Sequence, residues 1–146
     1  MITSKKWLSQ YMDLSDVTAQ QLADKMTEAG LEVEGIEPLA QGTNLEIGYV
    51  KECVDHPDSD HLHVCQVELA EGCEQIVCGA PNVRAGLKVI VAKVGAQLPE
   101  IQIKKSVIRG VESNGMICSL LELGVDPKQL SDAQKNGIEE LGEDAV

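Results

Sequence analysis

Apolar residues near the start of the chain recur at the spacing of an α-helix. In the segment SKKWLSQYMDL, Trp7, Leu8, Tyr11 and Met12 include pairs three and four positions apart. Residues at these separations share one helix face, because an α-helix has about 3.6 residues per turn. The pattern therefore predicts a first helix at the start of the chain.

A second helix is marked at both of its ends. Thr18 fits the N-cap position, and Gln21, three residues later, completes a capping box. Leu22 and Met26 then supply an apolar stripe at helical spacing, and Gly30 provides a C-terminal stop. These signals predict a helix between Thr18 and Gly30.

The segment LEVEGIEPL follows this helix and alternates apolar with acidic residues, which predicts a strand that Pro38 closes. Two helices and a strand over residues 1–39 bury too little apolar surface to be stable alone. Residues 1–39 are therefore expected to pack on the following domain, or to lack the partner strands that would complete them.

From residue 44 onward, short apolar runs alternate with turns rich in Gly, Pro, Asn and Ser, including VESNG at 111–115. A strand in GMICSLLELGV is expected to enter a short helix that Gly124 ends, and the polar tail to be irregular until GIEEL. The other expected strands lie at 46–54, 61–69, 74–78, 87–95, 101–105 and 106–110. About five strands and one short helix in roughly 100 residues favour a small closed β-barrel such as the OB-fold. The fold class is α+β, with a helix-and-strand module at 1–39 and a five-stranded barrel at 40–146.

The strand HLHVCQVEL changes its apolar phase partway along. Its apolar positions are 62 and 64 at first, and then 67 and 69. Such a change indicates a β-bulge, or a strand that is buried on both faces as it bends. We therefore expect the first hairpin of the barrel to be curved.

The composition narrows the class of protein. Aromatic residues make up 2% of the 146 residues and hydrophobic residues 43%, so the core is expected to consist of Val, Ile and Leu. The chain has no run of 18 apolar residues and no basic-then-apolar leader, which predicts a cytoplasmic protein without a membrane span. Five irregularly spaced cysteines then favour reduced, mostly buried thiols.

Charge is distributed unevenly along the chain, whose formal net charge is −12. The window 84–109 carries six basic residues and one acidic residue, a net charge of +5, so the remainder carries −17. The six are Arg84, Lys88, Lys93, Lys104, Lys105 and Arg109. A basic window in an acidic chain can attract a polyanion to one surface. The alternative is a solvated strand pair whose lysines protect a sheet edge.

Possible metal ligands are concentrated in HPDSDHLHVC, residues 56–65, and the four candidates are His56, His61, His63 and Cys65. His61, His63 and Cys65 would lie in a row on one strand face, and a row cannot surround an ion without a ligand from elsewhere. A turn formed by Pro57 to Asp60, with strand packing after it, is the favoured interpretation. We therefore expect no metal site, although a metal-binding regulatory β domain is retained as an alternative.

Two loops could contact phosphate. GAPNVRAG, residues 79–86, lacks the lysine of a Walker motif and is expected to be a tight hairpin that projects Arg84 and Lys88 at the barrel rim. In IRGVESNGMICS, Arg109 could contact phosphate, unless it pairs with Glu112. Cys118 in the same segment could be a nucleophile near a helix start, but a buried core cysteine is favoured. No catalytic residue is expected.

Three blocks of the sequence closely resemble the tRNA-binding domain that is appended to several translation proteins. These are HPDSDHLHVCQVEL, IVCGAPNVRAGLKVIVAKVGAQLP and IRGVESNGMICSLLELG. The opening segments KKWLSQYMDL and ADKMTEAGLEVEGIEPL resemble the start of bacterial phenylalanyl-tRNA synthetase β subunits. The resemblance implies an OB-fold over residues 40–146 and identifies the chain as an N-terminal fragment of such a subunit.

The resemblance also implies an accessory role in tRNA aminoacylation. The family's enzyme is an α₂β₂ tetramer that uses ATP and magnesium, so the implied partners are tRNA and the α subunit. No cofactor is expected in this fragment, which should be non-catalytic alone. The expected tRNA-binding residues are Arg84, Lys88, Lys93, Lys104, Arg109, Ser113 and Asn114. Two different interpretations are retained beside this one, a free-standing tRNA-binding protein and a purely structural scaffold.

Overall fold

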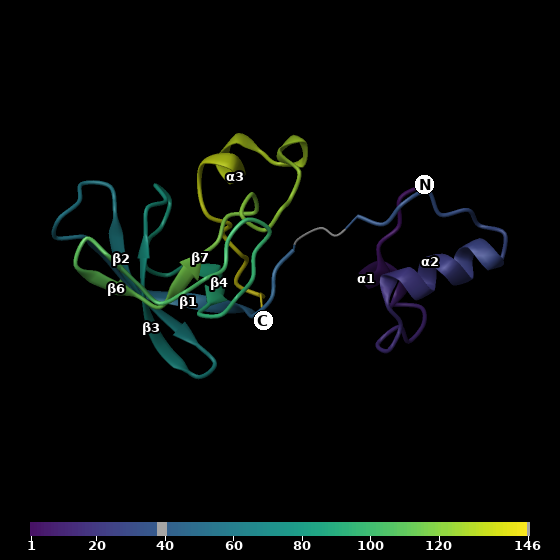
Figure 1. Ribbon diagram of the computed structural model, residues 1–146, viewed down its shortest axis with the longest axis horizontal. Helices are drawn as coiled ribbons and strands as arrows, with labels where there is room; N and C mark the ends of the chain where they lie inside the picture. Colours follow the sequence, from purple (N-terminus) through teal and green to yellow (C-terminus); the bar gives the residue numbers. More distant parts are fainter. Residues whose placement is uncertain (38–40, 146) are drawn as a thin grey trace. The chain divides into compact units, whose positions relative to one another are not determined.

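The computed structural model describes residues 1–37 and 41–145 (Figure 1). The chain divides into two compact units, Met1–Pro38 and Leu39–Val146. The sequence placed the strand closure at Pro38, which lies outside the described residues. In the described ranges, no helix is both long and apolar enough to cross a membrane.

The first unit contains the two expected helices. Helix α1 spans Lys5–Leu8 and is shorter than its apolar pattern suggested, and the Oγ of Ser4 caps it by accepting a hydrogen bond from the Trp7 N–H (3.0 Å). Helix α2 spans Ala19–Glu28 and begins with the predicted capping box between Thr18 and Gln21. Gly30 follows with φ +96°, the left-handed conformation that terminates many helices.

The strand expected after α2 is absent from the described residues, because 31–37 take no regular conformation. Alternation of apolar and acidic side chains defines two faces, but a strand also needs a hydrogen-bonded neighbour, and the described part of this unit offers none. Burial is also slight: Leu14 and Ala23 are its buried apolar side chains, whereas Trp7 is 53% exposed and Tyr11 73% exposed. The prediction that this piece is incomplete stays a prediction.

The second unit is a nearly closed antiparallel barrel, which confirms the OB-like fold and the α+β class. Its main sheet has the order β3-β2-β1-β4-β7, and β5 and β6 form a separate hairpin. The bounds are β1 Leu45–Asp55, β2 His63–Leu69, β3 Gly72–Cys78, β4 Lys88–Lys93, β5 Ser106–Ile108, β6 Val111–Ser113 and β7 Gly115–Ile117. Inside are close-packed aliphatic side chains, including Val50, Val67, Ile76, Val89 and Val91, each with zero exposure.

The barrel closes where β3 meets the segment joining β6 to β7. The Asn114 N–H donates to the Gln75 carbonyl (2.8 Å), and the Val77 N–H donates to the Ser113 Oγ (3.0 Å). Figure 1 shows β6 beside β3 at this junction. These bonds satisfy the outer edge of β3, which would otherwise expose a row of unpaired main-chain groups.

The predicted curvature of the first hairpin is present, but the bulge lies on β1. The pairing of β1 with β2 shifts between Val50 and Glu52, so Lys51 is the extra residue. Strand β2 has one continuous inward face, on which Cys65 and Val67 are buried. The apparent change of phase in β2 arose because Cys65 was not counted among its apolar residues.

Five other local predictions were wrong. GAPNVRAG is a loop and not a tight hairpin, because β3 and β4, which it joins, are not neighbours in the sheet. Residues 101–105 form no strand and contribute one isolated bridge, between Gln102 and Gln97. VESNG is not a turn: β6 spans its first three residues. Residues 118–124 form turns rather than a short helix, and Gly124 ends them with φ +81°. The tail contains a 3₁₀ turn at Pro127–Gln129 and helix α3 at Asp132–Asn136, which Ser131 caps, so it is more regular than its polarity indicated.

Candidate nucleic-acid interface

The loop between β1 and β2, residues 56–62, is built around His56, which is only 3% exposed. The Asp58 N–H donates to His56 Nδ1 at 3.0 Å, and His56 Nε2 lies 2.9 Å from the Ile108 carbonyl oxygen. Because Nδ1 accepts a hydrogen bond, the ring proton lies on Nε2, which donates to Ile108. His56 thereby joins the β1–β2 loop to the β5–β6 hairpin.

The other candidate metal ligands of this region have separate partners. His61 is exposed and lies 3.2 Å from Asp60, and His63 lies 3.4 Å from Asp55. The hydrogen bond from His61 lowers the pKa of the Asp60 carboxyl. Within residues 1–37 and 41–145, no three His, Cys, Asp or Glu side chains converge on a point that could hold a metal ion.

The β5–β6 hairpin, residues 106–113, is called the arm below. Its tip is the pair Arg109 and Gly110, with φ +48° and +85°. Positive φ at both central residues is the geometry of a type I′ turn, in which asparagine or glycine is usual at the first position. Arginine at this position is uncommon. Its Nη1 donates to the Asp58 carbonyl at 3.0 Å, so the arm tip also lies against the β1–β2 loop.

Lysines flank the base of the arm. Lys104 is exposed and has no ion-pair partner among the described side chains. The Lys105 ammonium lies 3.6 Å from the Glu112 carboxylate, with both side chains more than half exposed. A pair at this distance and exposure is easily exchanged for another anion, because surface ion pairs contribute only about 0–1 kcal/mol.

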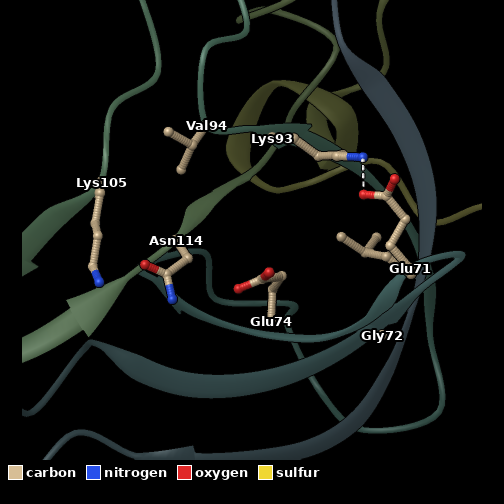
Figure 2. A pocket seen from close by; sticks show the side chains of 8 residues that line it. Glu71, Gly72, Glu74, Lys93, Val94, Lys105 and Asn114 are labelled. Carbon is tan, nitrogen blue, oxygen red and sulfur yellow. Dashed lines mark hydrogen bonds and ion pairs between the residues drawn. The ribbon is translucent and has the colours of Figure 1, made fainter.

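A groove of about 390 Å³ opens beside the arm and contains Lys93, Lys105 and Asn114 together with Glu71 and Glu74 (Figure 2). Lys93 Nζ lies 3.2 Å from the Glu71 carboxylate and 3.2 Å from that of Glu46. The hydrogen bond with Glu71 makes the largest contribution to raising the pKa of Lys93, and the hydrogen bond with Glu46 makes the next largest. The groove is therefore of mixed charge, with its lysine at β4 already neutralised.

Arg84 and Lys88 hold the C-terminal segment of the chain. The Arg84 guanidinium makes two hydrogen bonds to the Glu140 carboxylate, at 3.0 and 3.1 Å, and lowers the pKa of that carboxyl. Lys88 Nζ donates to the carbonyls of Glu143 (2.6 Å) and Ala145 (2.7 Å). Arg84 lies in the loop before β4, Lys88 begins that strand and Lys93 ends it, so the main-chain positions of the two lysines are about 17 Å apart by the rise per residue.

The seven expected tRNA-binding residues thus lie in several places. Ser113 is 1% exposed, and its hydroxyl is used inside the barrel, where it donates to the Gly115 carbonyl. Lys93 and Asn114 line the groove, and Lys104 and Arg109 belong to the arm region. The expected set omitted Lys105 and His56. The Lys-Lys pair was a signal for Lys105, while nothing in the sequence indicated that His56 contacts the arm.

Nothing in this arrangement indicates a nucleophile at Cys118. Its side chain has zero exposure, and its Sγ donates to the Met116 carbonyl at 3.6 Å. Burial raises the pKa of the Cys118 thiol to about 12, so it is protonated at neutral pH. The prediction of a buried core cysteine is confirmed.

Several known proteins are similar to this chain. Phenylalanine–tRNA ligase beta subunits of Shouchella clausii and Streptococcus pneumoniae are each 51% identical to the chain, over 94% and 100% of it. The chain spans 18% of the length of either relative. A MetRS-related protein from Pyrococcus horikoshii aligns over 69% of this chain and 82% of its own, with 19% identity and a TM-score of 0.47.

The family assignment comes from the barrel. Residues 45–144 match the model of the family described as "Putative tRNA binding domain". The match begins at the first residue of β1 and runs through the arm and α3 to the C-terminal segment that Arg84 and Lys88 hold. Because it covers more than half of the chain and the whole barrel, this chain belongs to the tRNA-binding domain family.

Proposed function

We propose that this chain binds tRNA through the arm and the adjoining β1–β2 loop, as an accessory module of a phenylalanine–tRNA ligase β subunit. The observation that carries the proposal is the contact between these two elements at Arg109 and Asp58. OB-folds hold nucleic acid with the loop between their first two strands and the loop between their last two. Here the second of these loops contains the arm, and basic residues occur at its base and tip.

The contacts are expected to be with the tRNA backbone rather than with stacked bases. The outer face of β2 and β3, on which many OB-folds stack bases, carries Val64, Gln66 and Gln75 and no aromatic side chain. Lys51 is the cation beside this face, and its ammonium pairs with Glu68 at 3.0 Å. Phosphate recognition by the arm therefore accounts best for tRNA binding by a domain with so few aromatic residues.

The residues proposed to contact tRNA are Lys104, Lys105 and Arg109, with Lys93 and Asn114 beside them in the groove. Lys93 is the weakest of these, because two carboxylates already surround it. Arg84 and Lys88 would contribute only if tRNA displaced the C-terminal segment. With a net charge of −12, the chain should bind weakly and with strong salt dependence.

We also propose the enzyme and the partner subunit with which the chain acts. By its likeness to phenylalanine–tRNA ligase β subunits, the chain would act in the cytoplasm beside an α subunit, which performs aminoacylation with ATP and magnesium. In this proposal the chain performs no chemical step of its own. Its contribution would be to the affinity and orientation of the tRNA.

Binding of fluorescent tRNA to the full chain, measured from low to moderate salt, tests the proposal. The double variant Lys104→Ala/Arg109→Ala should weaken binding and reduce the salt slope by roughly one for each phosphate that the chain no longer neutralises. The matched control is Lys128→Ala/Lys135→Ala, which removes the same charge from the tail and should leave both quantities near wild type. Undetectable binding at the lowest salt, or equal losses of affinity in the two double variants, would contradict the proposal and favour a structural scaffold.

A further inference from the structure

We propose that His56 is a positioning residue that holds Arg109 in place for contact with tRNA phosphate. The inference rests on the proposed tRNA binding by the arm. Three hydrogen bonds carry it, and together they form a closed ring between the β1–β2 loop and the arm. In this ring His56 donates to Ile108, Arg109 donates to Asp58, and Asp58 donates to His56.

The ring fixes the peptide group between Ile108 and Arg109. Ile108 directly precedes Arg109, so the hydrogen bond from His56 Nε2 to the Ile108 carbonyl (2.9 Å) holds the peptide group between the two residues. The same Asp58 that donates its N–H to His56 accepts from Arg109 through its carbonyl. One buried imidazole therefore sets both the main chain and the side chain of Arg109.

The guanidinium keeps the capacity to bind an anion after this contact. Arginine has five N–H donors, and in the described structure one group of Arg109, Nη1, is engaged with Asp58. The remaining edge is available for the bidentate geometry that suits a phosphate. The Asp58 carbonyl thus orients the fork on one side. The Asp60 carboxyl is near enough for Arg109 to help lower its pKa, but no carboxylate in the described residues forms a direct ion pair with Arg109, unlike Glu140 with Arg84.

The arm tip needs such support because its conformation is strained. Arg109 has φ +48°, and a residue other than Gly, Asn or Asp in this region is held there only by its surroundings. The base of the arm is tied to β3 through Gln75, whose side chain donates to the Glu112 carbonyl (2.8 Å). Beyond Glu112, the described hydrogen bonds of the tip with the rest of the barrel are those of the ring. Removal of His56 should therefore loosen the tip and leave the base in place.

Two amide substitutions separate the two roles of the imidazole. In His56→Asn the side-chain oxygen can replace Nδ1, because both atoms lie two bonds from Cβ, so the loop bond to Asp58 is kept and the bond to Ile108 is removed. In His56→Gln the side-chain nitrogen can replace Nε2, because both lie three bonds from Cβ, so the donor to Ile108 is kept. If His56 positions Arg109 through Ile108, the His56→Gln variant should retain tRNA affinity and the His56→Asn variant should lose it.

The decisive experiment is a double-mutant cycle of His56→Asn and Arg109→Ala, read as tRNA affinity and its salt slope. His56→Asn alone should weaken binding by about tenfold, as expected for roughly one charge-assisted hydrogen bond. In the Arg109→Ala background the same change should have almost no effect. Equal losses of affinity in both backgrounds, or an unchanged affinity in His56→Asn, would overturn the inference. Should His56→Asn fail to fold, a large loss of affinity in folded His56→Gln would also overturn it.

A readout without RNA distinguishes failure of this inference from failure of the proposed function. Hydrogen exchange at the backbone amides of residues 108–111 should accelerate in His56→Asn, while amides of the buried strand β4 stay protected. If wild-type chain binds no tRNA, the proposed function is wrong, whatever the exchange result. If tRNA binds, Arg109→Ala weakens it, and neither exchange nor affinity responds to His56→Asn, only the inference on His56 is wrong.

Discussion

The side-chain amide of Asn82 pairs with the main chain of Ile138 as a neighbouring strand would. Its Nδ2 donates to the Ile138 carbonyl at 2.9 Å, and its Oδ1 accepts from the Ile138 N–H at 3.0 Å. Ile138 is 5% exposed and belongs to the barrel core. One side chain in the loop before β4 thus satisfies both polar groups of a buried residue in the C-terminal segment.

Replacing Asn82 by alanine should destabilise the barrel by about 2–4 kcal/mol, because it leaves a buried N–H and a buried carbonyl unsatisfied. Urea unfolding followed by circular dichroism measures the change. Arg84→Ala is the matched control, since it frees the same segment from an exposed ion pair that is worth about 0–1 kcal/mol. Equal destabilisation of the two variants would contradict the role assigned to the amide.

Gly48→Ala should also destabilise the barrel, by about 1–3 kcal/mol from overpacking. A methyl group at Gly48 would point into the interior, 2.5 Å from Val67 Cγ1 and 2.9 Å from Val91 Cγ2. Both valines are fully buried and have little room to move. The midpoint of thermal unfolding reports the effect. Gly35→Ala, which meets nothing within 4 Å, should leave this midpoint unchanged, and a similar shift in both would refute steric crowding.

Stability should fall in acid partly through Glu46. The Ala70 N–H donates to its carboxylate, and with the smaller effect of Lys93 this lowers the pKa of Glu46 from its ordinary 4.5. Since the folded pKa is the lower one, the stabilisation is complete above pH 4.5 and is lost as the pH falls through the folded pKa. The free energy of unfolding should therefore differ between wild type and Glu46→Gln at pH 7 more than at pH 3. A difference independent of pH would exclude this titration.

The cysteines should differ sharply in reactivity. Cys73 is exposed, whereas Cys65, Cys78 and Cys118 are buried, and burial raises the pKa of each of these three thiols. Iodoacetamide at neutral pH should therefore modify Cys73 first, and the buried thiols only through opening of the barrel. Mass spectrometry of the peptides gives each rate, and labelling in urea shows that all are accessible when unfolded. Modification of Cys118 as fast as Cys73 in native buffer would contradict the buried core.

The sequence correctly predicted those helices and strands that depend on residues close together in the chain. The capping box of Thr18 and Gln21, and the alternation along the main strands, appear in the structure as expected. The turn in this region was predicted at the wrong residues, because Ser113, Asn114 and Gly115 have the composition of a turn. The chain reverses earlier, at Arg109 and Gly110. Arginine is not a residue that marks a type I′ turn, so tertiary contacts outweighed composition there.

The partners of charged side chains were harder to foresee than their positions. The basic window from Arg84 to Arg109 was evident in the sequence. Its ion pairs were not, because Glu140 neutralises Arg84 from 56 residues away and Glu46 pairs with Lys93 from 47 residues away. Periodicity carries no information on contacts at such separation. His56 shows the same limit, because its role depends on a carbonyl 52 residues further along the chain.

During synthesis, the edge of β3 stays unpaired until the later segment that covers it has been made. Translation proceeds from the N-terminus at about 5–20 residues per second, so β1, β2 and β3 emerge before the residues that cover the β3 edge. The β3 edge gains its hydrogen-bond partners only when Ser113 and Asn114 have been made. Ile138, the partner of Asn82, is synthesised later still. A ribosome that pauses between β4 and the arm would therefore display an unpaired strand edge, the kind of surface at which nascent chains associate with one another.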